Sequence, residues 1–380
     1  MFSRGAVVAL LAALLWFPLV GAALAHRPLE QFFRFPPPLE IPRDYPRWSW
    51  LACTGVLAPF AALAFLWLCS RARGNAAPTA AASVTPSARR RGFPAWGWAA
   101  LAWTAAWWIF AWTRFPWFAP LQRYTFFPLW LGFIVSVNAL TAATSGTCLL
   151  QRAPRSWAKL FAASALFWWV FEWLNRFVHN WHYLGVADFG PVGYALHATV
   201  CFSTVLPAVA AVGEWLGTRA LLQSRLARGP AWPWFEGKPT GCVLVGIGAA
   251  GLVLTGARPL QFYPMLWSAP LALLLGAGML VRRSGAWSEI AAGDWRRTGT
   301  WALAALACGF FWELWNFRSA AKWIYTVPFV DAAHVFEMPL LGYLGYLPFG
   351  VECLVVVTAL QSHDTGVGDP AASRSSAQSA

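Results

Sequence analysis

The sequence FWWVFEWLNRFVHNWHY at residues 167–183 has a counterpart about 141 residues later, GFFWELWNFRSAAKWIY at residues 309–325. Both stretches are apolar and aromatic, both carry a glutamate followed three positions later by an asparagine, and both end in a Trp-x-Tyr segment. Further out, a Pro-Leu-Gln segment begins at 120 and again at 259, and a Leu-Pro pair begins at 206 and again at 347. Because these matches keep their order at nearly constant offsets, the chain contains an internal repeat.

The composition places this repeat in a membrane. The 380 residues are 58% hydrophobic and only 11% charged, whereas soluble domains carry roughly 25% charged residues. A water-soluble enzyme, a disordered chain and a collagen are therefore excluded. A membrane span needs about 20 apolar residues, and we expect an all-α polytopic bundle of nine or ten spans. After the N-terminal run, the apolar runs are 49–69, 96–113, 126–150, 158–178, 193–216, 240–257, 262–281, 299–317 and 338–360.

The repeat divides this bundle into two copies of three spans. The first copy covers 126–217 and the second 262–360, and a linker with one span, 218–261, lies between them. An even number of turns through the membrane separates the two glutamate helices, so both copies have the same orientation, as in parallel repeats related by an axis along the membrane normal. We therefore expect a three-one-three core. An alternative is a four-span repeat in which 96–113 corresponds to 240–257.

Several segments lie outside the two copies. We expect an exposed Pro-rich segment, a first full span, a cytoplasmic linker, a span with an outer loop, and a disordered tail; these are 26–48, 49–69, 70–95, 96–125 and 361–380.

The first 25 residues have two interpretations. Arg4, an apolar run and the Ala23-Leu24-Ala25 segment are typical of a secretory signal peptide. The run is also nearly long enough to be an uncleaved first span. Cleavage after Ala25 is the favoured hypothesis.

The basic residues give the orientation. Alternate loops hold eighteen of the 28 Lys and Arg residues, and such loops are typically cytoplasmic. This bias explains the net charge of +13 without a nucleic-acid partner. It predicts that 71–95 is cytoplasmic and that 179–192 faces outward, in a protein of the bacterial cytoplasmic membrane whose first partner is the lipid bilayer.

The glutamates are the strongest candidates for chemistry. Acidic groups inside a span are costly and are functional candidates by default. Glu172 and Asn175 share a helix face, as do Glu313 and Asn316. We expect the two carboxylates to face each other between the copies as catalytic acid/base groups, oriented by the two asparagines. Interhelical hydrogen bonding that ties the copies together is the alternative.

Histidines extend the pattern in the first copy. If the helix persists, His179 and His182 continue the face of Glu172, and a metal site formed by these residues is one hypothesis. The seven cysteines form no C-x-x-C pair and are interpreted as small buried hydrophobes. The sequence contains no Walker A motif or dinucleotide fingerprint, and no cofactor can be named.

The 27 tryptophans are more than an interfacial belt requires. Aromatic walls suit a flat apolar ligand. We expect such a wall at the outer side, with a few polar groups, formed by Trp173, Trp181, Tyr183, Trp315, Trp323, Tyr325, His334 and Glu337.

The order of these features resembles the membrane lycopene cyclase domain family, which has tandem three-span units. Each unit there has a basic loop, an acidic residue near a helix end, a Trp-x-Tyr/Phe segment and a Pro-initiated last helix. Here the order reads Arg152/Arg155, Glu172, Trp181–Tyr183 and Pro191, then Arg282/Arg283, Glu313, Trp323–Tyr325 and Pro339.

The resemblance departs at the family's Pro-x-Glu-Glu motif, where this chain has Pro339-Leu340-Leu341 and Pro191-Val192-Gly193. It implies a protein that binds or modifies an isoprenoid or carotenoid-like lipid, rather than one that cyclises lycopene. Two alternatives stay open: a small-solute transporter with parallel repeats, and a non-catalytic membrane scaffold. Whether the protein is an enzyme is not decided by the sequence.

Overall fold

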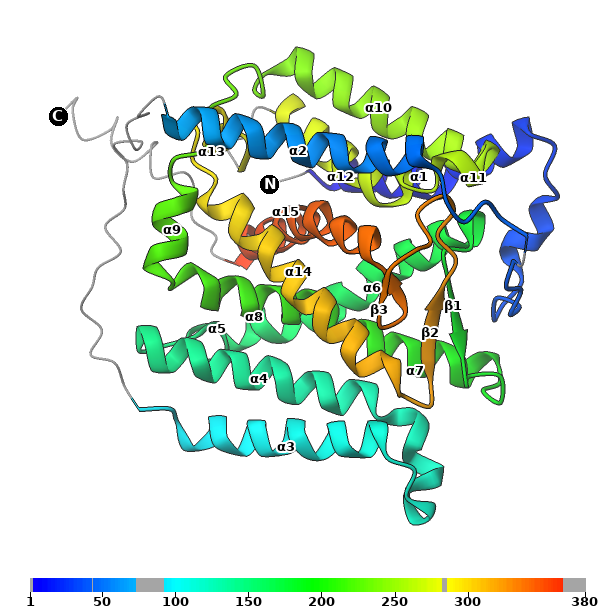
Figure 1. Ribbon diagram of the computed structural model, residues 1–380, viewed down its shortest axis with the longest axis vertical. Coiled ribbons are helices and arrows are strands. Elements are labelled where there is room, and N and C mark those ends of the chain that lie inside the picture. The colour runs from blue at the N-terminus through cyan, green and yellow to red at the C-terminus, as the bar shows by residue number, and fades with distance from the viewer. Residues whose placement is uncertain (1–2, 43, 73–91, 282–285, 365–380) are drawn as a thin grey trace.

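A computed structural model describes residues 3–42, 44–72, 92–281 and 286–364. The described residues form fifteen α-helices, most of them running side by side, and only four short strands (Figure 1). The long helices are α1 (Arg4–Leu24), α2 (Trp50–Ala72), α3 (Ala95–Trp112), α4 (Phe126–Ser145), α6 (Pro154–Val178), α7 (Pro191–Phe202), α8 (Val205–Gly217), α10 (Lys238–Ala257), α12 (Met265–Leu280), α14 (Arg296–Phe317) and α15 (Tyr346–Asp364). The short helices are α5 (Leu149–Arg152), α9 (Ala220–Leu226), α11 (Pro259–Phe262), α13 (Ala286–Ala291) and the 3-10 turns η1 (Leu29–Phe33), η2 (Pro116–Tyr124) and η3 (Leu340–Gly345).

The helices confirm a polytopic membrane protein. Within the described ranges, six segments are long and apolar enough to cross a bilayer: α1, α2, α4, α7 with α8, α10, and η3 with α15. Helices α3, α6 and α14 have 18, 25 and 22 residues. Helices α6 and α14 lie among the candidate spans, and α3 lies at the edge of the bundle beside α4 (Figure 1). Six tryptophans lower the mean hydropathy of α3, whereas charged and amide residues lower that of α6 and α14. Helix α12 is a shorter apolar helix of 16 residues.

The two three-helix repeats are parallel, as expected. Helix α6 leads into strand β1 (Trp181–Leu184) and α14 leads into β2 (Lys322–Tyr325), and these strands pair with each other. The C-terminal ends of α6 and α14 therefore lie at the same end of the bundle. Helices α8 and α15 both return in the opposite direction (Figure 1).

The strand pair is centred between the repeats. It is antiparallel, and its register places Trp181 opposite Tyr325, His182 opposite Ile324, and Tyr183 opposite Trp323. Equivalent residues of the two repeats thus occupy equivalent places on either side of the His182–Ile324 pair. A second short hairpin joins β3 (His334–Val335) to β4 (Met338–Pro339).

Aromatic residues pack across the repeats in the same two-fold manner. Trp130 of α4 packs on Trp312 of α14, with ring centroids 5.2 Å apart. Trp267 of α12 packs on Phe171 of α6, with centroids 5.3 Å apart. Phe171 and Trp312 each directly precede a repeated glutamate, so one aromatic core places both glutamate helices.

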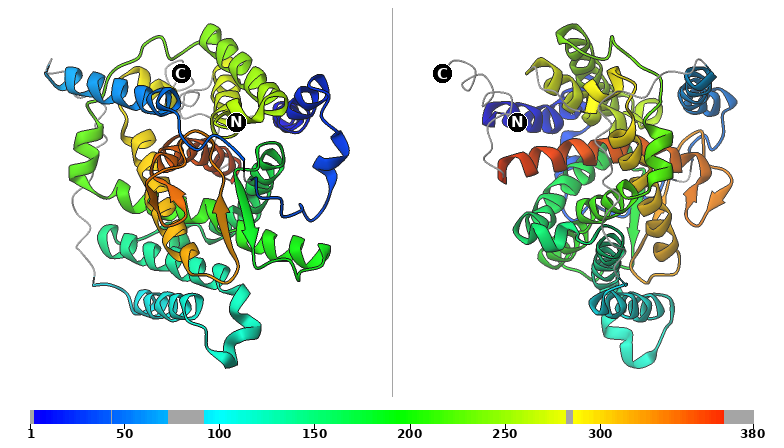
Figure 2. Two further views of the ribbon diagram at one scale, coloured as in Figure 1. Left: turned by 45° about the vertical axis from the view of Figure 1, so that its right-hand side comes forward. Right: turned by 90° about the vertical axis from the view of Figure 1, so that its left-hand side faces the viewer.

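Each repeat carries a fourth helix. Helix α3 packs on α4, and α10 packs on α12 in the corresponding place. This arrangement matches the four-span alternative, in which α10, the linking span of the three-one-three core, corresponds to α3. Helix α1 packs on the outside of α10, and α2 lies at the edge of the bundle (Figure 2).

The third span of each repeat is broken, which the continuous apolar runs did not predict. Helix α7 ends at Phe202 and α8 begins at Val205, while in the second repeat η3 ends at Gly345 and α15 begins at Tyr346. Pro207 and Pro348 therefore lie in the first turn of α8 and α15, where a missing N–H costs no helical hydrogen bond.

The proposed C-terminal tail and the proposed linker 70–95 lie largely outside the described residues. The proposed tail begins at 361, but α15 continues to Asp364, and residues 365–380 lie outside the described residues. Most of the proposed linker 70–95, from 73 to 91, also lies outside them.

Candidate functional site

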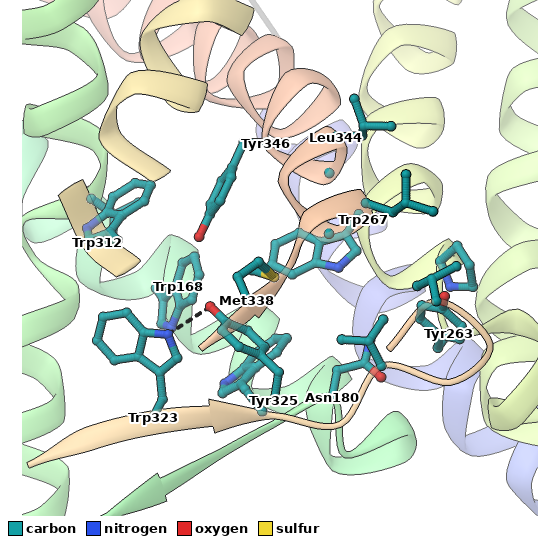
Figure 3. A pocket seen from close by; sticks show the side chains of 18 of the residues that line it. Trp168, Asn180, Tyr263, Trp267, Trp312, Trp323, Tyr325, Met338, Leu344 and Tyr346 are labelled. Carbon is teal, nitrogen blue, oxygen red and sulfur yellow. Dashed lines mark hydrogen bonds between the residues drawn. The ribbon is translucent and has the colours of Figure 1, made fainter. Parts of the chain in front are cut away.

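A cavity of about 620 Å³ lies between the two repeats and beside α2. Its wall is mainly apolar and rich in aromatic residues, with side chains from both repeats pointing into the same space (Figure 3). The aromatic residues that line it include Trp168, Trp181, Tyr183, Trp267, Trp312, Trp323, Tyr325 and Tyr346.

Two asparagines hold the strands that form part of this wall. The Asn175 amide donates to the Trp181 carbonyl (2.9 Å), and its oxygen accepts from the backbone N–H of Asn180 (2.7 Å). The Asn316 side chain binds both backbone groups of Trp323, at 2.7 and 2.8 Å. We expected these asparagines to orient the glutamates, but their polar atoms instead bind the chain that follows each helix.

Glu172 is buried behind the wall and accepts three aromatic hydrogen bonds. Its Oε1 accepts from the indole N–H of Trp168 (3.0 Å), the indole N–H of Trp181 (2.9 Å) and the hydroxyl of Tyr183 (2.6 Å). All three donors also line the cavity. The side chains that donate to Oε1 of Glu172 therefore lie between this oxygen and the cavity.

Glu313 occupies the equivalent place with a different set of donors. Its Oε1 accepts from the hydroxyls of Tyr325 (2.7 Å) and Tyr346 (2.9 Å). Trp323 donates to the Tyr325 hydroxyl (2.7 Å) rather than to the carboxylate (Figure 3). Oε2 of Glu313 is buried and has no hydrogen-bond partner among the described residues.

The surroundings of the two glutamates differ at two pairs of equivalent positions, and in each pair only one repeat carries a hydrogen-bond donor. Trp168 of the first repeat corresponds to Gly309 of the second, and Val205 corresponds to Tyr346, both at an offset of 141. A Cβ on Gly309 would lie 2.3 Å from Cδ2 of Tyr346, so the tyrosine ring lies directly on this glycine. Glu172 thus receives a hydrogen bond from Trp168 of its own helix α6, whereas Glu313 receives one from Tyr346 of the adjacent helix α15.

Few charged groups reach the cavity. Arg123 and Lys322 line it, and each is paired with an acid outside the lining, Arg123 with Asp188 (3.1 Å) and Lys322 with Glu337. The site is therefore an apolar aromatic chamber whose cations are neutralised by neighbouring carboxylates.

The structure brings part of the expected binding wall together. Trp181, Tyr183, Trp323 and Tyr325 line the cavity, whereas Glu172 and Glu313 lie one layer behind it. The remaining expected residues point elsewhere: Trp173 donates to the Leu15 carbonyl, Trp315 packs on Trp130 and Phe133, His334 pairs with Asp331, and Glu337 pairs with Lys322.

The histidine stripe is interrupted. Helix α6 ends at Val178, His179 adopts a left-handed conformation (φ 54°), and His182 lies on β1. His182 Nε2 lies 3.2 Å from the Thr326 hydroxyl, and burial together with the nearby His179 lowers the pKa of His182 to about 4. Within the described ranges no group of three His, Cys, Asp or Glu side chains is placed to hold a metal ion, so the two histidines lack a third ligand there.

Several lining residues were not anticipated. Trp267 ends Pro264-Met265-Leu266-Trp267, the counterpart of Pro128-Leu129-Trp130 in the first copy, and Tyr346 stands two residues before the repeated proline. The repeat itself was therefore a usable signal for both. The contribution of α2 had no sequence signal, because nothing in its apolar run distinguishes a cavity-facing side from a lipid-facing one.

Comparisons of the chain with protein families, with characterised proteins and with solved structures found no match.

Proposed function

We propose that the protein binds an isoprenoid or carotenoid-like lipid in the aromatic cavity between its repeats, on the outward-facing side of a bacterial cytoplasmic membrane. The observation that carries this proposal is the cavity wall. The volume of the cavity, about 620 Å³, falls within the range of sites for small organic ligands. Indole and phenol faces attract flat, polarisable hydrocarbons and can stabilise positive charge on them.

Modification of the lipid, rather than binding alone, would require a route for protons. The hydroxyls of Tyr183, Tyr325 and Tyr346 donate to the buried glutamates, and the same side chains line the cavity. We propose these phenols as the groups nearest the ligand, with Glu172 and Glu313 as the acceptors behind them.

A transporter is the second candidate, and the broken third spans favour it. Discontinuous helices in equivalent places of two repeats are a common feature of solute sites near the bilayer midplane. Uptake of a polar solute by proteoliposomes would support this candidate. The cavity is apolar, and its two cationic side chains, Arg123 and Lys322, are each paired with a carboxylate. These features favour a lipid over a polar solute as the ligand.

The test is to fill the cavity. Gly345 lines it and has open space where a Cβ would be, so Gly345→Trp places an indole in the chamber without a backbone clash. Gly246 on α10 has equally open space and does not line the cavity, which makes Gly246→Trp the matched control.

The readout is mass spectrometry of lipid extracted from the purified proteins. We expect an isoprenoid lipid with the native protein and with Gly246→Trp, and at least a fivefold loss with Gly345→Trp. Equal lipid content in both variants, or phospholipid alone in the native protein, would contradict the proposal.

A further inference from the structure

Helix α2 forms one side of the cavity but hardly touches the bundle. Only 6% of the residues in its span are buried, against 61% for α4. Figure 2 shows α2 at the edge of the molecule. Five of its residues nevertheless line the cavity, at the spacing of a single helix face: Ala52, Gly55, Val56, Pro59 and Phe60.

The two ends of α2 are attached. Before its first turn, the backbone N–H of Ser49 donates to the Phe329 carbonyl (2.9 Å), and Trp48 forms a β-bridge with Val330. Near its other end, the ring of Trp67 lies 5.6 Å from that of Trp295. Between these attachments, the inner face of α2 lines the cavity from Ala52 to Phe60.

The chemistry of this inner face defines what can lie against it. Its five residues carry no charged or hydrogen-bonding side chain, and a Cβ at Gly55 would meet nothing within 4 Å. From Ala52 to Phe60 the face extends about 12 Å, at 1.5 Å per residue. The rest of the lining is mostly apolar and includes aromatic side chains from both repeats.

We propose that the cavity admits an extended apolar hydrocarbon sideways from the bilayer, on its α2 side, and that the bound molecule lies along α2 as the packing partner of that helix. The inference rests on the proposed lipid function and adds the shape, orientation and entry side of the ligand. The ligand has an unbranched or flat hydrocarbon part of at least about 12 Å, with no polar group along the face of α2.

The test compares two alanines on opposite faces of α2. Ala52 lines the cavity, whereas Ala61 is exposed on the other side of the helix and does not. Ala52→Trp fills the space between helix and bundle, and Ala61→Trp adds the same side chain to the lipid-facing surface. The probe is all-trans β-carotene, added to protein in phosphatidylglycerol vesicles, with vesicles alone as the reference.

Hydrogen exchange of the α2 backbone and extracted β-carotene are the two readouts. We expect β-carotene to slow exchange over residues 52–60 at least fivefold in the native protein and in Ala61→Trp, and to have no effect in Ala52→Trp, which should retain little carotene. Gly55→Phe serves as a second cavity-filling variant if Ala52→Trp does not fold.

The outcomes separate the two proposals. If β-carotene binds but exchange of α2 is unchanged, or if both alanine variants bind it equally, the ligand does not lie along α2 and this inference fails while the lipid function stands. The inference also fails if vesicles alone protect α2 to the same extent. If neither β-carotene nor a native isoprenoid binds, the proposed function itself fails.

Discussion

Glu172 and Glu313 occupy equivalent positions of the repeat, but they accept different numbers of hydrogen bonds. Three donors converge on Glu172, the buried Trp181 and the partly buried Trp168 and Tyr183. Two donors converge on Glu313, and one of them, Tyr325, also accepts a bond from Trp323. A buried donor left without an acceptor costs about 1–3 kcal/mol. The stability of the bundle should therefore be more sensitive to loss of Glu172.

We predict that Glu172→Ala lowers the free energy of unfolding by about 3 kcal/mol or more, since it strands three donors, and that Glu313→Ala costs less. Glutamine keeps an acceptor oxygen, so Glu172→Gln should recover most of the loss. Chemical unfolding in detergent measures all three variants. Equal losses for the two alanine variants would show that the aromatic donors do not contribute as the geometry requires.

At this scale the sequence predicted which side chains repeat but not what each one binds. The Glu-x-x-Asn spacing correctly put Glu172 and Asn175 on one helix face, and both are buried. It did not predict that Asn175 binds the backbone of Asn180 and Trp181, because that contact requires the chain to reverse at His179. A left-handed histidine has no clear sequence signature.

Among the elements, α1 packs so closely on α10 that the contact favours an uncleaved span over a cleaved signal peptide. A Cβ on Gly21 would lie 1.8 Å from the Val253 carbonyl oxygen, and one on Gly256 would lie 1.9 Å from that of Pro18. The two helix backbones therefore pack directly on each other. Arg27 adds hydrogen bonds to the carbonyls of Gly256 and Phe177.

We therefore predict that α1 is retained as a span in the mature protein, so the intact mass should include residues 1–25. Gly21→Leu should separate α1 from α10 and lower the thermal midpoint by several degrees. Gly5→Leu is the control, because the position of a Cβ on Gly5 has only the Ser3 hydroxyl within 4 Å, at 3.9 Å.

A mature N-terminus at His26, or equal midpoints for the two variants, would restore the signal-peptide interpretation. Composition could not separate the two, since a signal peptide and a short span share an apolar run. The difference lies in Gly21, whose closeness to α10 depends on a helix more than 200 residues away.

For the whole molecule, the repeat and the charge bias predicted most of the architecture. The basic loops around α5, α9 and α13 lie at one end of the bundle, and the strands and η2 lie at the other (Figure 1). Periodicity could not predict the cavity, because its volume depends on how far α2 stands from the repeats. It also missed the breaks before Val205 and Tyr346, where the apolar run continues.

This arrangement gives a labelling prediction. In a cysteine-free background, Asp188→Cys near the strands should react with a membrane-impermeant maleimide added to intact spheroplasts. Ser224→Cys on α9 should react only after lysis, because α9 lies at the basic end. The reverse pattern would place the cavity on the cytoplasmic side.

The register of β1 and β2, centred on His182 and Ile324, is the one that two identical chains would form around a two-fold axis. The halves of this protein thus meet as the subunits of a closed homodimer do, each presenting the same surface to the other. Fusion into one chain removes the requirement for strict symmetry, since a substitution then appears in one half alone. Gly309 in place of a second Trp168, and a single α2 on one flank of the chamber, are differences that a homodimer could not maintain.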